Sequence, residues 1–404
     1  MDITTKNQLD EFIITNWVDI NAYIDQQMHG KEIPFYTSVD IRESRTKYAP
    51  VDNNLYPAGF NNLCLLDLDA TSKQIKETID GDSQRVGILV ESNTKNKFYL
   101  DNIFFLSNSI RESGKDVVLL SFDNKLFSNE QVTLNLESHS KFPIEIYLAN
   151  VVNNHVNIID KNLVVDFLVI NNDQSAPINL DWSSIRTKMS PSPEMGWYRR
   201  QKVKHFEAYR DVISNFCEKF NIDTNLLQAK FKSVHDVDFS TKVGLDDLAN
   251  QVNELKTQIN SDKKVFIKAS KGTYGMGIHV VTNGEDVKNL NRKKRNKLDI
   301  GKNKIKFTDV LIQEGVETII NYDNMPAEVT IYLIGGKSVG GFMRANSERD
   351  SSENLNSKGM VFKKFCISEI RQNRDDVMKE AVYSIIGRLS CLASIVEYER
   401  TQRG

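Results

Sequence analysis

The feature that most constrains the fold is a glycine-rich segment between two predicted strands. Residues 268–277 read KASKGTYGMG, between the apolar runs Val265–Lys268 and Gly277–Val281. A Walker A loop would require Gly-Lys-Ser/Thr at the end of the segment, and a Rossmann fingerprint would require a helix after it. Neither is present, so the segment predicts a β-hairpin. Its turn either closes over a ligand or is an ordinary turn.

The residue types in this hairpin suit the binding of phosphate groups. Glycine lets the backbone approach a ligand closely, and successive backbone N–H groups can hold phosphate oxygens. The predicted contacts comprise one lysine on the strand and donors or flexible positions in the turn: Lys268, Ser270, Lys271, Gly272, Thr273, Gly275 and Gly277.

Earlier in the chain, the spacing of apolar residues predicts a different architecture. The runs Val86–Val90 and Val117–Phe122 flank a helical stripe over Asn102–Arg111. A strand, a helix and a strand in this order normally form a parallel pair with a crossover connection. Segment 171–195 is rich in Asn, Asp, Ser and Pro, which indicates a boundary. We therefore expect a Rossmann-like α/β domain followed by an α+β domain, with single helices near each terminus (Leu9–Ile24 and Val377–Val396).

Composition excludes several classes of function. Lys and Arg number 52 and Asp and Glu 54, a formal net charge of -2. This balance argues against a nucleic-acid or membrane-surface partner. The four cysteines (Cys64, Cys217, Cys366 and Cys391) and the six histidines are scattered, so we expect reduced thiols and no thiolate or histidine metal site. Apolar stretches are too short for a membrane span, and the N-terminus lacks the pattern of a signal peptide, so we expect a cytoplasmic protein.

Two further segments complete a pattern that resembles the ATP-grasp ligases. Val310–Gly315 is an apolar strand ending in Gln and Glu, and Glu328–Arg344 is a hairpin with an acid at one end and an arginine at the other. The resemblance implies that Lys268 contacts the α- and β-phosphates of ATP. It places Gln313, Glu314 and Val316 at the adenine and Glu328 in the nucleotide site. Arg344 would then stabilise the moving γ-phosphate.

Longer motifs make the resemblance more specific. PFYTSVDIRESRTKYAPVDNNLYPAGFNNL (34–63), SPSPEMGWYRRQKVKHFEAY (190–209), KASKGTYGMGI (268–278), VLIQEGV (310–316) and GGFMRANSERDSSENLNSKGM (340–360) are similar to the proteobacterial glutamate–cysteine ligase of the ATP-grasp-like type. This implies ligation of glutamate and cysteine with ATP and Mg²⁺, or Mn²⁺. The alternatives are another ATP-grasp carboxylate–amine ligase and a catalytically silent nucleotide-binding protein.

The sequence departs from the ATP-grasp pattern in its metal ligands. The chain ends soon after the last predicted helix, which leaves no room for the usual C-terminal acidic strands. One hypothesis is a permuted arrangement, in which Asp40, Asp52 and Asn54 hold the metal. The alternative is that segment 34–63 is a substrate loop and that Glu353, Asn354 and Asn356 hold the metal.

The glutamate α-carboxylate requires a cation, for which the candidates are Arg42, Arg45, Arg199 and Arg200. The predicted units are an N-terminal helix with the substrate and metal motif (1–63), the Rossmann-like domain (64–190) and an ATP-grasp-like domain (191–404).

Overall fold

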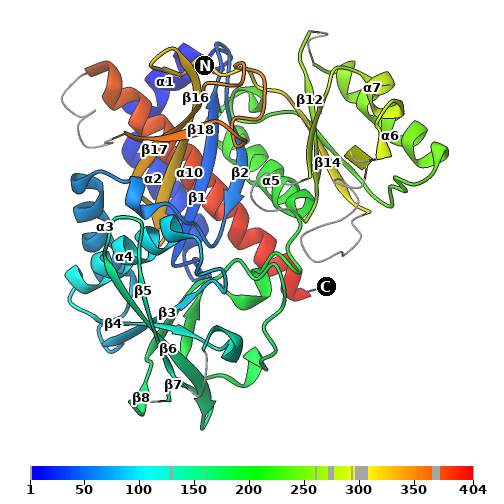
Figure 1. Ribbon diagram of the computed structural model, residues 1–404. Coiled ribbons are helices and arrows are strands. Elements are labelled where there is room, and N and C mark those ends of the chain that lie inside the picture. The colour runs from blue at the N-terminus through cyan, green and yellow to red at the C-terminus, as the bar shows by residue number, and fades with distance from the viewer. Residues whose placement is uncertain are drawn as a thin grey trace.

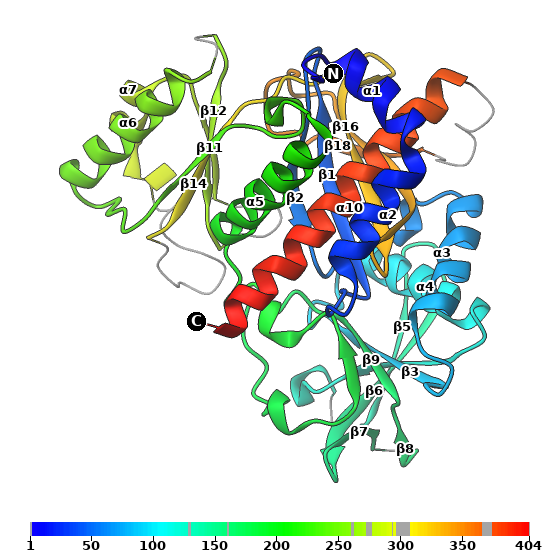
Figure 2. The ribbon, with the colours of Figure 1, turned by 180° about the vertical axis from the view of Figure 1, so that it is seen from behind.

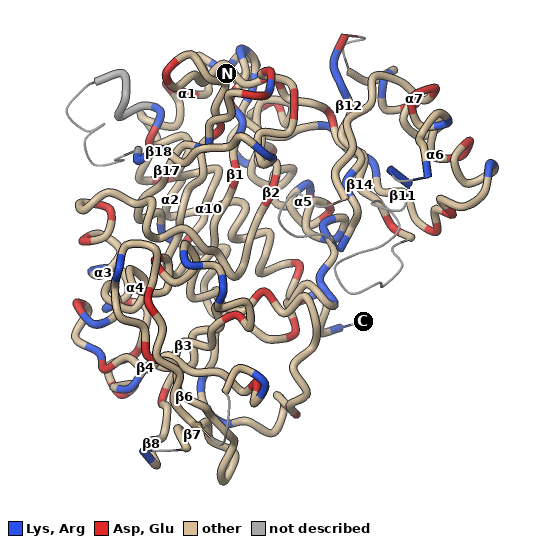
Figure 3. The backbone as a smooth tube through the Cα atoms, viewed as in Figure 1, with Lys and Arg blue, Asp and Glu red and all other residues tan. Residues whose placement is uncertain are grey.

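The structure is a computed structural model with a mixed α/β fold that contains three β-sheets (Figure 1). It describes residues 2–127, 131–159, 161–259, 262–271, 277–292, 294–295, 308–365 and 374–403. Figure 3 shows acidic and basic residues interspersed along the chain, in keeping with the small net charge.

The central sheet is antiparallel and combines strands from both halves of the chain. Its order is β18 (Met360–Phe365), β17 (Lys337–Asn346), β16 (Met325–Ile334), β1 (Tyr36–Glu43) and β2 (Tyr48–Asn54), with β15 (Asn321–Tyr322) paired to β16. β1 pairs directly with β16, so that Asp40 lies opposite Thr330. The segment predicted as a separate N-terminal unit therefore shares a sheet with the predicted third unit.

A second sheet is largely parallel. Its order is β10 (Lys188–Ser190), β9 (Phe167–Asn171), β3 (Arg85–Val90), β4 (Asp116–Ser121), β6 (Pro143–Val152), β7 (His155–Ile158) and β8 (Leu163–Val164), with β5 (Thr133–Glu137) on β6. Helix α4 (Lys97–Glu112) connects β3 to β4, and these two strands are parallel, which confirms the predicted strand–helix–strand unit. Helix α3 (Leu65–Thr78) joins this region to the central sheet through contacts with β17.

The third sheet contains the glycine-rich hairpin. Its order is β11 (Phe231–Val234), β14 (Val310–Glu314), β12 (Val265–Ala269) and β13 (Ile278–Val281). β12 and β13 are antiparallel, which confirms the predicted hairpin, while the turn residues 272–276 lie outside the described residues. Helices α6 (Lys242–Lys256) and α7 (Gly284–Lys288) share an apolar core with this sheet (Figure 1). We call this unit the hairpin lobe.

Four helices stack against the central sheet, as Figure 2 shows from behind: α1 (Lys6–Thr15), α2 (Trp17–Met28), α5 (Lys202–Phe220) and α10 (Arg374–Arg403). The prediction of a single N-terminal helix was wrong. Asn16 leaves helical geometry at φ -106° and ψ 23°, and its side chain donates to the Phe12 carbonyl at 3.0 Å, so the apolar stripe is divided between two helices. The remaining helical turns are short: η1 (Phe60–Asn62), η2 (Asn124–Leu126), η3 (Trp182–Ser184), η4 (Pro193–Met195) and η5 (Thr224–Leu226).

Helix α10 is the interior helix of this stack. Among the described residues, Lys379–Arg403 has the length and apolar composition that a membrane span would need, but 83% of its most apolar window is buried inside the protein. Its apolar character is therefore explained by packing against the central sheet and α5.

The expectation of reduced thiols holds for two cysteines. Cys217 and Cys391 are free and buried. Cys64 was predicted wrongly, because it is disulfide-bonded, and scattered positions in the sequence do not reveal which residues the fold brings together. Cys366 lies outside the described residues.

Candidate active site

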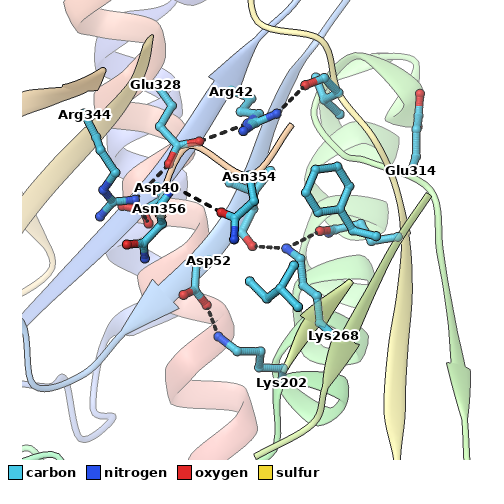
Figure 4. A pocket seen from close by; sticks show the side chains of 15 residues that line it. Asp40, Arg42, Asp52, Lys202, Lys268, Glu314, Glu328, Arg344, Asn354 and Asn356 are labelled. Atoms are coloured by element: carbon cyan, nitrogen blue, oxygen red, sulfur yellow. Dashed lines mark hydrogen bonds and ion pairs between the residues drawn. The ribbon is translucent and has the colours of Figure 1, made fainter. Parts of the chain in front are cut away.

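A cavity lies between the central sheet and the hairpin lobe and is partly open to solvent (Figure 4). It is lined by residues of β1, β2, α5, β12, β13, β14, β16, β17 and the segments that follow β14 and β17: Asp40, Arg42, Val51, Asp52, Lys202, Phe266, Lys268, Ile278, Gln313, Glu314, Val316, Glu328, Arg344, Asn354 and Asn356.

On the sheet side, two arginines and two acids form a continuous ion-pair network (Figure 4). Arg344 Nη1 donates to Asp40 Oδ2 at 2.7 Å and to Glu328 Oε1 at 2.8 Å. Arg42 Nε donates to the other oxygen of Glu328 at 2.9 Å. These residues share a face because Glu328 lies opposite Arg344 and Asp40 opposite Thr330, whose hydroxyl donates to Asp40 Oδ1 at 2.7 Å.

Burial and charge act differently on the two acids. Burial would raise the pKa of both carboxyls. For Glu328 the charges of Arg42 and Arg344 outweigh burial, so its pKa is lowered. Asp40 has Arg344 as a partner but also faces Glu328 and Asp52, and its pKa is raised. The site therefore holds one carboxylate that is firmly ionised and one that a bound cation would help to ionise.

On the side of the hairpin lobe, Lys268 and Lys202 approach β2 (Figure 4). Lys268 Nζ donates to the Val51 carbonyl at 2.7 Å and to Gln313 Oε1 at 2.8 Å. Lys202 Nζ forms an ion pair with Asp52. Burial lowers the pKa of Lys268 to about 8. Burial would raise the pKa of Asp52, but Lys202 and Lys268 together lower it.

Of the residues predicted to bind nucleotide, six line this cavity: Lys268, Gln313, Glu314, Val316, Glu328 and Arg344. Ser270 is buried and Gly277 precedes β13, while Lys271 is half-buried. Gly272, Thr273 and Gly275 lie outside the described residues. Glu314 also forms two ion pairs that the sequence did not predict. Its carboxylate accepts from Lys47 Nζ at 2.9 Å and from Lys263 Nζ at 2.5 Å.

The two alternative sets of metal ligands meet at the same cavity. Asp40 and Asp52 lie directly opposite each other on β1 and β2, and both line the cavity, as do Asn354 and Asn356. Asn54 is on the same strand as Asp52 but is not among the lining residues. The Glu353 carbonyl accepts from Arg42 Nη2 at 2.5 Å, and its carboxylate accepts from the Asp350 N–H at 3.2 Å. Within the described ranges, no group of three or more His, Cys, Asp or Glu residues could hold a metal ion.

The four candidate arginines have different positions. Arg42 is buried in the cavity wall and donates to Glu328 and to the Val316 carbonyl at 3.1 Å. Arg45 is exposed in the turn after β1. Arg199 is exposed near Glu194 at 3.4 Å. Arg200 is buried in a bidentate pair with Glu397 of α10, at 3.0 and 2.9 Å.

Arg200 reaches the site indirectly, through Asn53. Its Nη1 and Nη2 donate to the carbonyl and the side-chain oxygen of Asn53, both at 2.9 Å, and Asn53 is the neighbour of Asp52 on β2. Lys202 was not predicted as a site residue. It belongs to the motif at 190–209, but only its ion pair with Asp52 of β2 in the folded chain identifies its role.

Comparison with known proteins identifies the family of the chain. The family model described as GshA, glutamate-cysteine ligase, matches residues 10–398. A crystal structure from Methylobacillus flagellatus KT, assigned as a gamma-glutamylcysteine synthetase, is similar with a TM-score of 0.86 and 30% sequence identity, over 97% of this chain and 96% of that chain. No curated protein matches the chain.

Two other solved structures are more distant. D-alanyl-alanine synthetase A from Vibrio cholerae O1 biovar eltor str. N16961 has a TM-score of 0.38 and 11% identity, over 75% of this chain and 81% of that chain. A glutathione synthetase-like effector from Globodera pallida has a TM-score of 0.40 and 9% identity, over 88% and 84%. At these scores neither contributes to the argument. The family match and the first structure suffice: the chain belongs to the GshA glutamate-cysteine ligase family.

Proposed function

We propose that the protein joins the γ-carboxylate of glutamate to the amine of cysteine, which is the first step of glutathione biosynthesis. A γ-carboxylate oxygen attacks the γ-phosphorus of ATP, and ADP leaves. The cysteine amine then attacks the acyl carbon of the γ-glutamyl phosphate, the C–O bond to phosphate breaks, and the amine loses its proton. Phosphoryl transfer of this kind depends on positioning and charge neutralisation, for which the cavity supplies Arg344 and Lys268.

The observation that carries the proposal is a set of buried polar atoms without partners among the described residues. Ser270 Oγ, Gln313 Nε2 and Arg344 Nε have no hydrogen-bond partner there. Buried polar groups are nearly always paired, so each such atom requires an explanation. All three belong to residues predicted to bind nucleotide, and Gln313 and Arg344 line the cavity. A polar, anionic ligand such as ATP would accept from these donors.

A divalent ion would fit the sheet side of the cavity. Mg²⁺ is usually held by one or two carboxylates together with phosphate oxygens. Asp40 and Asp52 are the carboxylates that we assign to it, with Asn354 and Asn356 as neutral neighbours. When bound, the ion would supply positive charge that neutralises the phosphates. Of the predicted metal ligands, Asn54 is the one that the geometry supports least.

We further infer how the fold is organised. Residues 64–190 form a Rossmann-like unit, and residues 191–404 form an ATP-grasp-like unit that the N-terminal residues 1–63 complete. The direct pairing of β1 with β16 supports the permuted arrangement, because it places two acids beside Glu328 and Arg344, as the C-terminal strands of an ATP-grasp domain would.

The test is release of phosphate from ATP by the purified chain, with γ-glutamylcysteine identified by mass spectrometry. Release should require both glutamate and cysteine. The Arg344→Met variant should lose it. The Lys337→Met variant, altered on the same strand at an exposed pair with Glu77, should keep it. Release with glutamate and a different amine would indicate another carboxylate–amine ligase. ATP binding without turnover would indicate a silent nucleotide-binding protein.

A further inference from the structure

None of the four candidate arginines provides a free cation in the cavity that could bind the α-carboxylate of glutamate. Arg42 and Arg200 are buried with acidic partners, and Arg45 and Arg199 are exposed outside the lining of the cavity. The proposed reaction places the γ-carboxylate beside Arg344. Of the lysines that line the cavity, Lys202 is paired with Asp52 and Lys268 is assigned to the phosphates, so we looked for a further cation on the same face of the central sheet, within one glutamate length of Arg344.

The register of the strands identifies the residues on that face. Asp40 lies opposite Thr330, Thr330 opposite Phe342, and Phe342 opposite Lys364. Directly opposite residues of antiparallel strands share a face, so this row runs from the proposed metal ligand to β18 at the edge of the sheet.

Aromatic contacts show that Phe342, Phe362 and Arg344 project from the same face of the central sheet. The Phe342 and Phe362 rings are in a T-shaped contact at 5.3 Å, and the Arg344 guanidinium lies 6.0 Å from the centroid of Phe362. Lys364 follows Phe362 by two residues on β18 and therefore projects to the same side. Its neighbour Lys363 projects to the opposite side, where its ammonium lies 4.9 Å from the Tyr322 ring.

The distance suits a five-carbon amino acid. Arg344 lies opposite Phe362, so Lys364 is its diagonal neighbour, with about 7–8 Å between the two backbones. A glutamate whose γ-carboxylate is held at Arg344 could lay its methylene groups along Phe362, which is 42% exposed, whereas Phe342 is buried. Its α-carboxylate would then point toward Lys364, which is exposed and has no ion pair within the described part of the chain.

The segment after β2 approaches the same area. η1 contacts β18, and the Tyr332 hydroxyl donates to the Ala58 carbonyl. A Cβ at Gly59, where φ is +114°, would lie 3.2 Å from the Phe342 ring and 3.4 Å from the Asn62 amide nitrogen. Glycine is therefore required here, and this segment packs against the buried Phe342 ring, which leaves Phe362 as the exposed ring of the pair.

We propose that Lys364 binds the α-carboxylate of the glutamate substrate and so selects an α-amino acid over a simple carboxylic acid. This assignment rests on the proposed function. It identifies the exposed Phe362 ring between Arg344 and Lys364 as the path of the substrate, with phosphoryl transfer at one end and specificity at the other.

The experiment compares Lys364→Met with Lys363→Met in steady-state assays that vary glutamate, ATP or 4-aminobutyrate, which is glutamate without its α-carboxylate. Loss of one charge-assisted hydrogen bond at an exposed site corresponds to about a tenfold change in KM. We expect Lys364→Met to raise the glutamate KM about tenfold with the ATP KM unchanged, and to reduce the preference for glutamate over 4-aminobutyrate by the same factor. Lys364→Arg keeps the positive charge and should therefore have a glutamate KM and a preference for glutamate close to those of the wild type. Lys363→Met should resemble the wild type.

Three results would overturn the assignment. The first is a glutamate KM for Lys364→Met that stays within twofold of the wild type. The second is an equal loss for glutamate and 4-aminobutyrate, because the lysine would then act on something other than the α-carboxylate. The third is wild-type protein that releases no phosphate with glutamate and cysteine, which would refute the proposed function together with this inference.

Discussion

Lys268 links the stability of the fold to nucleotide binding, and pH separates the two effects. The lysine is buried, and its partners in the cavity are the neutral oxygens of Val51 and Gln313. A charged amine in this position costs free energy in the free protein but attracts a polyphosphate. Replacing it with methionine should therefore strengthen the fold and weaken ATP binding.

The magnitude follows from the pKa. Burial lowers the pKa of Lys268 from 10.5 to about 8, which corresponds to about 3 kcal/mol. Since the folded-state pKa is below the unfolded value, the unfolded chain binds more protons between pH 8 and 10.5. The free-energy cost of burying the charged amine is absent above pH 10.5 and is fully present below pH 8. In the protein without ATP, Lys268 loses its proton as the pH rises through about 8. Because the phosphates bind the charged form, the ATP dissociation constant should increase about tenfold between pH 7 and pH 9.

Two assays check this. Isothermal titration should show ATP affinity that falls above pH 8 in the wild type and is weak and independent of pH in Lys268→Met. Urea unfolding should show that the wild type gains stability relative to Lys268→Met, by up to about 3 kcal/mol, as pH rises from 8 to 10.5. Lys337→Met serves as the control, because Lys337 pairs with Glu77 at an exposed site outside the lining of the cavity. Wild-type ATP affinity that stays constant to pH 10 would refute the reasoning.

Three further predictions concern other parts of the site. Arg344→Lys keeps the charge but loses the planar guanidinium that spans Asp40 and Glu328, so steady-state assays should show a lower kcat with little change in the ATP KM. Asp52→Asn should raise the Mg²⁺ concentration needed for half-maximal turnover, whereas Glu353→Gln should be mild; the reverse result would favour the alternative set of metal ligands. Arg200→Met leaves Glu397 buried without its bidentate partner and should destabilise the fold by about 3–5 kcal/mol in urea unfolding.

Local patterns in the sequence predicted the elements of this protein well. The β12–β13 hairpin, the β3–α4–β4 unit and the β16–β17 hairpin all depend on short-range spacing of apolar residues and glycine, and all three are present. The break in the N-terminal helix was missed because the apolar stripe continues through Asn16, and only the capping geometry reveals two helices.

The side chains of the candidate site were harder to predict, because their positions depend on contacts between distant segments. Asp40 and Arg344 are 304 residues apart and form an ion pair because β1 pairs with β16. Four arginines looked equivalent as carboxylate ligands, yet Arg200 is directed away from the cavity by a partner 197 residues later, Glu397. Lys202 and Lys364 carry no local feature that distinguishes them from surface lysines.

The whole candidate site depends on contacts between distant segments, because the central sheet is built from strands at both ends of the chain. β1 and β2 come from the first 54 residues, whereas β16, β17 and β18 come from the last 80, and the Asp40–Arg344–Glu328–Arg42 network exists only when the two groups of strands pair. Pairing between such distant segments has a large entropic cost in the unfolded chain. Burial of α10 against both groups of strands offsets that cost, since its apolar face contacts Val39 and Ile41 of β1 as well as Ile331 and Leu333 of β16 within one core. The apolar composition of α10 is therefore the sequence feature that favours assembly of the candidate site from opposite ends of the chain.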